Sequence, residues 1–495
     1  MAPLRLNNLP NSSDAALPNP EAVSGLVSAS ARGLLPWLVA VAFFMESLDT
    51  TILNTAVPAV SAALHVTPLA MKAVLASYTL ALAVFIPISG WMADRFGTRI
   101  VFASAIGMFT LGSLLCGLCS NIHMLVFCRI IQGFGGAMMV PVGRLTLVRT
   151  FPKSELIRVM SFISIPALVG PMLGPVVGGL IVHYLHWRLI FFVNLPIGLL
   201  GLVLVYLHLP DFREPKTPPL DIVGLILFGS GIGLFSYVLE VFGEHALSVR
   251  EIFSLLGLAV ALIVGYGMHA NSIRFPLLHL GVFRVRTFRA SVTGGLVTRL
   301  GIGGVPFLLP LLYQVGLGYT PVQSGLLIMP QAIAAMCMKT ILRQLLQRIG
   351  YRGVLISNTV LIGVVLCLFS VIGLHTPVWV ILLLAFCFGA LTSLQYTSMN
   401  TLVYADITEE EASNASSIAS TMQQMAISFG VAIAGLCTVF FLGANAAASP
   451  AAFIHGVHKS FYALGGLTVL STVVFHSLRA GDGDSVSQHK VLHSD

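Results

Sequence analysis

The sequence contains very little charge. Only 9% of its 495 residues are Asp, Glu, Lys or Arg, and 56% are hydrophobic, whereas soluble domains carry about a quarter charged residues. So little charge cannot cover a hydrophobic core with a surface that faces water, and the mean hydropathy is +0.92. The composition therefore excludes an ordinary soluble protein and places most of the chain in lipid.

Catalytic and metal-binding motifs are lacking as well. The sequence contains no GxxxxGK[ST] phosphate loop, which argues against an ATP-driven pump, and no HExxH zinc motif. Its seven cysteines lie inside apolar runs, and an odd number there argues against a disulfide framework. Cys116 and Cys119 share a helical face, but no His or acidic residue stands beside them to complete a metal site. We therefore expect no enzyme, no cofactor and no metal ion.

The net charge of +7 does not indicate a nucleic-acid partner, because no cluster of basic residues with interleaved aromatics occurs. The basic residues lie instead in short connections between apolar runs, which is typical of cytoplasmic loops. Those on the expected cytoplasmic side include Arg95, Arg99, Arg149, Arg213, Arg284, Arg348 and Arg352. We expect a multi-pass protein of the cell (inner) membrane with both termini in the cytoplasm.

Apolar runs of about 20 residues recur along the whole chain, and each is long enough to cross a hydrocarbon core of about 30 Å. They predict an all-α polytopic membrane protein of about fourteen spans. The expected spans lie near residues 36–58, 70–92, 100–119, 122–145, 157–182, 187–209, 221–241, 250–270, 287–315, 321–343, 352–373, 376–402, 414–440 and 458–478.

A short internal repeat indicates two related halves. The pattern R-x-G-x-R follows the second span of the first six, at residues 95–99, and the second span of the last six, at residues 348–352. Secondary transporters contain such repeats, and their substrate sites lie between the halves. We therefore expect a cytoplasmic tail (1–33), a six-helix bundle (34–209), a linker with two extra transmembrane helices (210–286), a second six-helix bundle (287–478) and a cytoplasmic tail (479–495).

Two glycine-containing motifs stand in the first half. In the connection GWMADRFGTR, we expect Gly90 to let helices approach, Asp94 to cap the next helix, and Arg95 and Arg99, which flank Gly97, to keep the turn cytoplasmic. An ordinary positive-inside turn is the alternative. In the fifth span, the sequence GPMLGPVVGG places small residues on one helical face for close packing, and its prolines bend the helix. Its motif residues are Gly170, Pro171, Gly174, Pro175, Gly178 and Gly179.

Acidic residues inside apolar spans are costly and are therefore functional candidates. Glu46 and Asp49 lie three residues apart on one face of the first span, and Arg129 lies in the fourth. Counted at 1.5 Å per residue, Asp49 lies ~12 Å and Arg129 ~10 Å below the outer surface, so the two can pair. A pair that merely holds two helices together is the alternative to a functional site.

These motifs, together with LDTTILNTAVP at 48–58, RIIQGFGGA at 129–137 and WRLIFFVNLPIG at 187–198, resemble the major facilitator superfamily and, within it, the 14-span drug:proton antiporters. The resemblance covers residues 36–478. It implies proton-driven efflux of drugs or other amphiphiles, with a proton-carrying role for Asp49 and a coupling role for Arg129. Some members work with a periplasmic adaptor and an outer-membrane channel, but no residue here identifies such a partner.

Other polar residues within the spans are candidates for binding substrate. They are Asn54, Gln132, Arg299, Gln314, Gln395 and Asn400. Hydrogen bonding between helices explains them equally well, and Arg299 and Gln314 have no obvious partner nearby in the sequence. Two rival functions stay open. One is import of a metabolite, which would accumulate substrate in energised right-side-out vesicles, and the other is a receptor or lipid-translocating protein.

Overall fold

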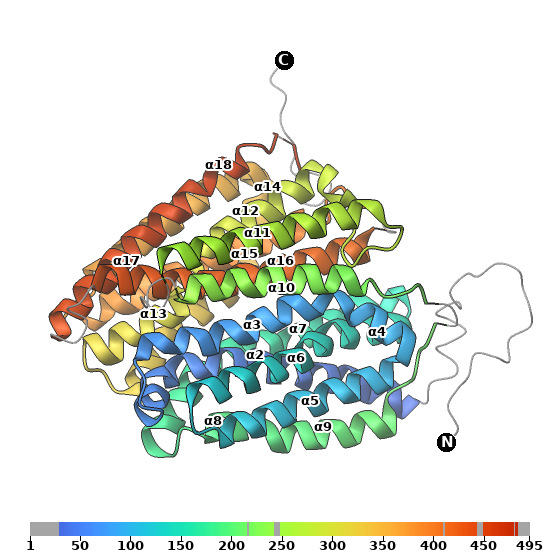
Figure 1. Cartoon of the computed structure of the whole chain (residues 1–495), viewed down its shortest axis with the longest axis horizontal. Helices are drawn as coiled ribbons and strands as arrows, with labels where there is room; N and C mark the ends of the chain where they lie inside the picture. Colours follow the sequence, from blue (N-terminus) through green and yellow to red (C-terminus); the bar gives the residue numbers. More distant parts are fainter. Residues whose placement is uncertain are drawn as a thin grey trace, which may run out of the picture.

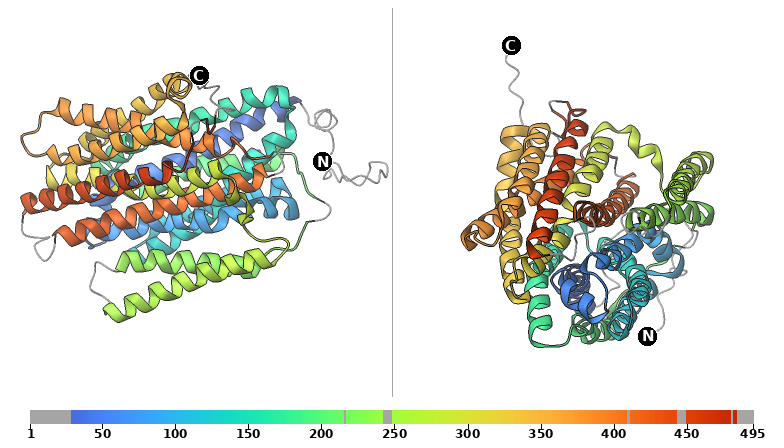
Figure 2. Two further views of the ribbon diagram at one scale, coloured as in Figure 1. Left: turned by 90° about the horizontal axis from the view of Figure 1, so that it is seen from above. Right: turned by 60° about the vertical axis from the view of Figure 1, so that its left-hand side comes forward.

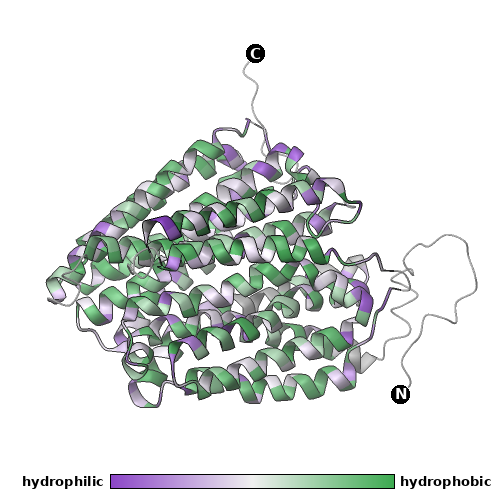
Figure 3. Cartoon of the chain, viewed as in Figure 1, coloured by the Kyte–Doolittle hydropathy of each residue, from purple (hydrophilic) through white to green (hydrophobic). Residues whose placement is uncertain are grey.

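The computed structural model describes residues 29–214, 217–241, 248–408, 411–442, 449–479 and 481–483, so most of both expected tails lies outside the described residues. Long helices run side by side through nearly all of this part of the chain (Figure 1). Hydrophobic residues dominate their surfaces (Figure 3). The protein is an all-α, multi-pass membrane protein, as its composition predicts.

Within the described residues, eleven helices are long and apolar enough to cross a membrane. One of these, Pro321–Val371, contains two expected spans, because the chain turns at Gly350 inside it. Another expected span has an apolar part, Val169–Tyr184, that is shorter than the others. The total of fourteen spans therefore stays a prediction.

The first group of helices comprises α2 (Ala29–Ala63), η2 (Pro68–Met71), α3 (Lys72–Phe85), η3 (Ile86–Ile88), α4 (Ser89–Phe96), α5 (Thr98–Leu118), α6 (Ile122–Thr150), α7 (Lys153–Tyr184), α8 (Leu189–Phe192) and α9 (Asn194–His208). A pair follows, α10 (Ile222–Val241) and α11 (Val249–Ser272). The second group comprises η4 (Leu280–Arg284), α12 (Arg286–Ile302), α13 (Val305–Leu311), η5 (Leu312–Gly316), α14 (Pro321–Leu368), η6 (Phe369–Val371), α15 (Val378–Leu402), α16 (Ala412–Leu442), α17 (Pro450–Leu470) and α18 (Thr472–Phe475).

The repeated R-x-G-x-R pattern has the same backbone feature at both of its positions. Gly97 has φ 96° and Gly350 has φ 74°, a region that side chains other than glycine rarely adopt. Each glycine reverses the chain between two antiparallel helices. At Gly97 a side chain would also collide with Asp211, whose Oδ1 would lie 2.3 Å from an added Cβ.

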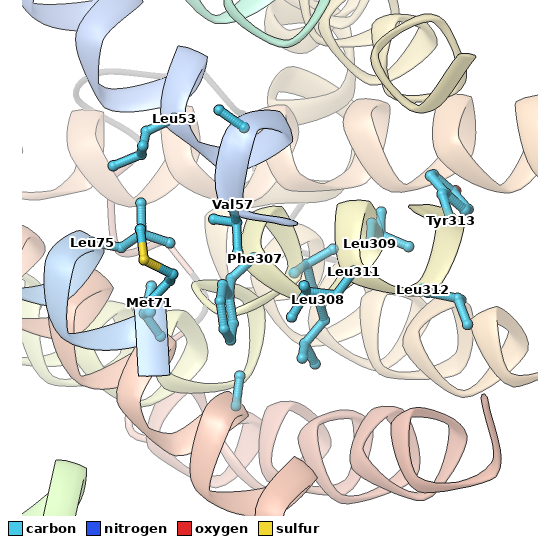
Figure 4. Close-up of a cluster of buried hydrophobic side chains, with 14 of the residues drawn as sticks. Leu53, Val57, Met71, Leu75, Phe307, Leu308, Leu309, Leu311, Leu312 and Tyr313 are labelled. Carbon is cyan, nitrogen blue, oxygen red and sulfur yellow. The ribbon is translucent and has the colours of Figure 1, made fainter. Parts of the chain in front are cut away.

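The two groups share one hydrophobic core at only one end of the molecule. We call the end at which α2 begins the proximal end and the opposite end the distal end. At the distal end, Leu53 and Val57 of α2 lie in one buried cluster with Leu75 of α3 and with Phe307 and Leu308 of α13 (Figure 4). Elsewhere the fully buried residues of the two groups fall in separate clusters, and Leu80 of α3 packs against the cluster that α10 and α11 share with the second group.

Two seams join the groups along their length. At one seam, α7 packs against the first part of α14 through a reciprocal glycine contact: an added Cβ on Gly179 would lie 2.4 Å from the carbonyl oxygen of Pro321, and one on Gly325 would lie 2.4 Å from that of Pro175. At the other seam, α3 packs against α16, and α10 lies along both (Figures 1 and 2). Buried Lys72 of α3 donates a hydrogen bond to the Glu240 carbonyl of α10 at 2.8 Å.

Candidate functional site

Helix α2 carries the acidic residues and is held closely against α7. An added Cβ would lie 2.6 Å from Ser47 Cβ at Gly170, 2.1 Å from Thr51 Oγ1 at Gly174, and 2.4 Å from the Ile52 carbonyl oxygen at Gly178. The three glycines therefore form one face that fits the backbone of α2, as the motif predicts. Because this contact leaves no room for side chains, it fixes the position of Asp49 within the bundle.

Asp49 and Arg129 form an ion pair in the interior of the first group. Arg129 Nη1 donates to Asp49 Oδ2 at 2.6 Å, and each side chain is only 1% exposed. The prediction that Asp49 and Arg129 lie at similar depth and can pair is therefore confirmed. The Arg129 guanidinium also lies 4.2 Å from the centre of the Tyr78 ring, which adds a cation–π contact.

Neutral polar side chains complete the surroundings of the pair. Gln132 Nε2 donates to Asp49 Oδ1 at 2.8 Å, and Asn194 Nδ2 donates to the same oxygen at 3.0 Å. Gln132 Oε1 accepts from Arg129 at 2.8 Å, and Ser113 Oγ accepts from both amides. The carboxylate thus receives hydrogen bonds on both oxygens.

Glu46 lies one turn before Asp49 on α2 but in different surroundings. It is half-buried, and within the described residues no hydrogen bond is donated to its carboxylate, although Thr50 Oγ1 donates to its backbone carbonyl at 2.8 Å. Among charged groups, Arg144 of α6 has the largest electrostatic effect on Glu46. Its guanidinium also lies over the Phe43 ring. The carboxylates of the two acids on α2 therefore differ in their surroundings: that of Asp49 is paired and hydrogen-bonded, and that of Glu46 has no described hydrogen bond.

The candidate substrate-binding residues occupy several different environments. Gln132 and Gln395 are completely buried. Gln395 bonds to Thr359 and Asn358 inside the second group, which is the interhelical bonding that the sequence left open. Gln314 Nε2 donates to the carbonyl oxygen of Thr55 at 2.9 Å and so joins the two groups at the distal end.

Two candidates meet in the second group, and one stands apart. Arg299 of α12 is 5% exposed and donates to Asn400 Oδ1 of α15 at 3.3 Å. Its guanidinium lies 4.6 Å from the centre of the Tyr396 ring. Asn54 is half-buried on α2 and makes no side-chain hydrogen bond with a described residue.

Comparison with known proteins now identifies the family. Residues 39–431 match the family model described as Major Facilitator Superfamily. The chain belongs to the Major Facilitator Superfamily. A "Putative multidrug resistance protein MdtD" from Pectobacterium atrosepticum is 38% identical over 446 residues, which is 90% of this chain and 93% of the relative. The protein of the same name from Escherichia coli (strain K12 / DH10B) is 40% identical over 405 residues, 82% and 86% of the two chains.

Solved structures share the fold. A peptide transporter POT in complex with sulfate aligns with a TM-score of 0.67 and 15% identity, covering 93% of this chain and 98% of that one. A D-xylose-proton symporter aligns with a TM-score of 0.65 and 15% identity, covering 92% and 99%. Identity this low carries the fold alone. Membership of the superfamily makes this chain a transporter of small molecules rather than an enzyme.

The superfamily loop after α3 forms contacts that differ from two of our expectations. Asp94 does not cap α5; its Oδ1 accepts from Arg149 Nη2 at 2.9 Å, because this long side chain reaches it from the end of α6. The α5 terminus is satisfied instead by Asp211, whose Oδ1 accepts from the Arg99 backbone at 3.2 Å. Gly90 does not mediate a close approach either, since no described atom would lie within 4 Å of an added Cβ.

The remaining residues of this loop lie at the proximal end. Arg95 is exposed, as expected for a turn that faces water. Arg99 Nε donates to the Leu209 carbonyl at 2.6 Å, and Arg149 also pairs with Glu214 at 3.2 Å. The loop is therefore fastened to the segment that follows α9, an attachment that the sequence pattern did not reveal.

Sequence reasoning missed three residues of this network: Asn194, which donates to Asp49, Ser113, which accepts from Asn194 and Gln132, and Tyr78, which lies against Arg129. Asn194 stands in the stretch WRLIFFVNLPIG that supported the family resemblance, but nothing singled it out as a site residue. Ser113 is a small residue in an apolar run and carries no signal of its own. A buried carboxylate needs several hydrogen-bond donors. Asn194 could have been found from the sequence by looking in every span for polar residues at the depth of Asp49.

Proposed function

We propose that this transporter exports drugs or other amphiphilic small molecules in exchange for protons, by alternating access across the cell (inner) membrane. The observation that carries the proposal is the buried Asp49–Arg129 pair with its ring of amide donors, in a chain about two-fifths identical to proteins named for multidrug resistance. A charge inside a membrane span is costly, and its usual roles are ion coupling and substrate binding. The proposal concerns passage across one membrane and includes no adaptor or outer-membrane channel.

We assign the proximal end to the cytoplasm. Arg95, Arg99 and Arg149 support this orientation, because basic residues next to spans favour the cytoplasmic side. We also propose bundles at 34–209 and 287–478 with a linker at 210–286 and cytoplasmic tails. The separate clusters of fully buried residues away from the distal end support that division. With the distal end closed by one apolar cluster, this conformation faces the cytoplasm.

Helix α2 provides a route from the proton site to the distal closure. Asp49, Leu53 and Val57 are spaced four residues apart and so follow one face of the helix. Val57 lies about 12 Å along the axis from Asp49. Protonation of Asp49 removes its charge and weakens its bond to Arg129, which frees α2 to move relative to α6. That movement would separate Leu53 and Val57 from α13 and open the distal end.

Glu46 is the second proton site in this mechanism. Its position one turn closer to the cytoplasm, with no described hydrogen bond to its carboxylate, supports a relay that releases the proton inward. The Asp94–Arg149 pair and the glycines of α7 have conformational roles: the pair holds the loop at the cytoplasmic end, and Gly170, Gly174 and Gly178 keep α7 packed against α2, so that the two helices move together.

The decisive experiment measures proton flux and substrate flux together. Purified protein in liposomes that contain a pH-sensitive dye should release protons only when an exported compound is present, and inside-out vesicles should accumulate that compound when energised. Asp49→Asn should abolish the coupled flux. A matched control is Glu251→Gln, because Glu251 is an exposed capping residue of α11 far from the pair in sequence and environment. Coupled transport that survives intact in Asp49→Asn would sink the proposal.

A further inference from the structure

Arg299 is a second buried arginine, and it lies near the middle of the membrane. It stands about 20 Å along the helix from the start of α12, and the helical segment Arg286–Gly316 continues well beyond it. Its side chain is 5% exposed. Guanidinium groups stay charged in proteins, so this residue places a full positive charge inside the second group of helices.

No acid neutralises this charge. Within the described ranges no ion pair involves Arg299, and its polar neighbours are the neutral side chains of Asn400 and Gln423, each 3.3 Å from Nη2. Its Nε is buried and has no hydrogen-bond partner. A cation–π contact with Tyr396 adds to these hydrogen bonds. Arg129 differs at this point, because a carboxylate lies 2.6 Å from it.

The guanidinium borders a small recess between three helices. Its lining includes Ser291 and Leu296 of α12, Met399 and Asn400 of α15, and Met422 and Gln423 of α16. The free space amounts to about one water molecule, so it has room for one oxygen atom of a head group, and the rest of a ligand would lie outside it. Asn400 is exposed, which gives the recess an opening. Apolar and polar residues share the lining, which suits an amphiphile.

We infer that Arg299 binds the anionic head group, a carboxylate or another oxyanion, of the amphiphilic substrate. A bound oxyanion would supply the missing counter-charge and accept a hydrogen bond from Nε, and Asn400 and Gln423 would donate to it through their amide groups. The inference rests on the proposed export function, because it names the substrate class of that transporter. It concerns binding alone, so it can fail while proton-coupled export holds.

The test compares three ligands that share one apolar body: 4-octylbenzoate, its methyl ester and 4-octylbenzylammonium. Equilibrium binding of radiolabelled ligand to purified protein in phosphatidylcholine nanodiscs, without a proton gradient, is measured first. Wild type should prefer the benzoate. Arg299→Gln should weaken benzoate binding by about tenfold to a hundredfold, the effect of a charge-assisted hydrogen bond, and leave ester binding within about threefold. Arg299→Lys should retain most of the preference, and exposed Arg274→Gln should match wild type.

A second variant protects the test against a folding defect in Arg299→Gln. Gln423→Glu places a carboxylate beside Nη2, so the arginine acquires an internal partner that competes with the ligand. It should lose the benzoate preference and unfold at a temperature no lower than wild type. Equal binding of all three ligands by wild type, binding of none, or equal losses for benzoate and ester in Arg299→Gln would each overturn the inference. Proton-coupled flux of the ester or the ammonium compound would still support export.

An anionic phospholipid offers the same head-group chemistry as an exported carboxylate. Adding phosphatidylglycerol to the nanodiscs separates the two sources. Benzoate binding that is unchanged by this lipid supports an exported ligand. If phosphatidylglycerol displaces the benzoate from wild type and leaves ester binding unchanged, the same oxyanion site is supported and its ligand is a lipid.

Discussion

Replacement of Asp49 by Asn separates the coupling role of the buried pair from its structural role. The carboxylate accepts from Arg129, Gln132 and Asn194 at 2.6, 2.8 and 3.0 Å. An amide has one acceptor oxygen in place of two, so its NH₂ group must face one of these donors. Arg129 also loses its counter-charge while it stays buried. Removal of one partner from a buried pair costs about 3–5 kcal/mol, so Asp49→Asn should unfold at a clearly lower temperature than wild type.

The double variant Asp49→Asn/Arg129→Gln decides between the two roles. Both charges are then absent, and the double variant should recover more than half of the lost stability, because the two residues are directly coupled. If the pair only holds α2 against α6, transport should recover with stability. We expect stability to return while proton-coupled flux in liposomes stays absent. Recovery of coupled flux in the double variant would refute the assignment of Asp49 as the proton carrier.

Three further predictions follow from backbone and interface contacts. Gly174→Ala should lower stability by about 1–3 kcal/mol through overpacking against α2, whereas Gly90→Ala, where no described atom would meet the added Cβ, should have little effect; thermal unfolding in detergent compares them. Gly97→Ala and Gly350→Ala should each cost about 1–3 kcal/mol because of their positive φ, and equal stability to wild type would contradict this reading. Gln314→Ala removes about 1 kcal/mol of hydrogen bonding between the two groups. Distances between spin labels across the distal end should then show about fivefold more of the open state. An unchanged distance distribution would count against a role of Gln314 in closure.

The features predicted correctly depend on distance along a single helix. The depth of Asp49 and Arg129 follows from the rise per residue, and the shared face of Gly170, Gly174 and Gly178 follows from the period of the helix. Neither requires knowledge of which helices are neighbours beyond one assumed pair. The repeated R-x-G-x-R pattern pointed to equivalent turns in the two halves, and the structure adds that Gly97 and Gly350 both have a positive φ.

The failures depend on contacts between segments distant in sequence. Local rules make Asp94 a reasonable helix cap, but its carboxylate instead accepts a hydrogen bond from Arg149, which lies 55 residues later in the sequence. Gln395 is polar inside a span, and only the packing of α14 against α15 shows that Asn358 satisfies it. Ser113 and Asn194 become parts of the Asp49 network because α9 packs against α2, and α5 packs against α6 and α9. Sequence patterns do not show which helices, distant in the sequence, pack against one another.

The charges of Asp49 and Arg299 have a consequence for the energetics of export. The first helix of the first group carries a buried acid, and α12 carries a buried arginine that forms no ion pair with any described residue. Exchange of one inward proton for one outward neutral molecule moves one charge, worth about 2.3 kcal/mol at 100 mV, which supports a gradient of about 50-fold. Exchange for a monovalent anion moves two charges, worth about 4.6 kcal/mol and about 2,000-fold. Exchange for a monovalent cation moves none. A site that selects an anion therefore lets the membrane potential drive export even without a pH gradient, which gives a functional reason to retain a costly unpaired arginine inside the membrane.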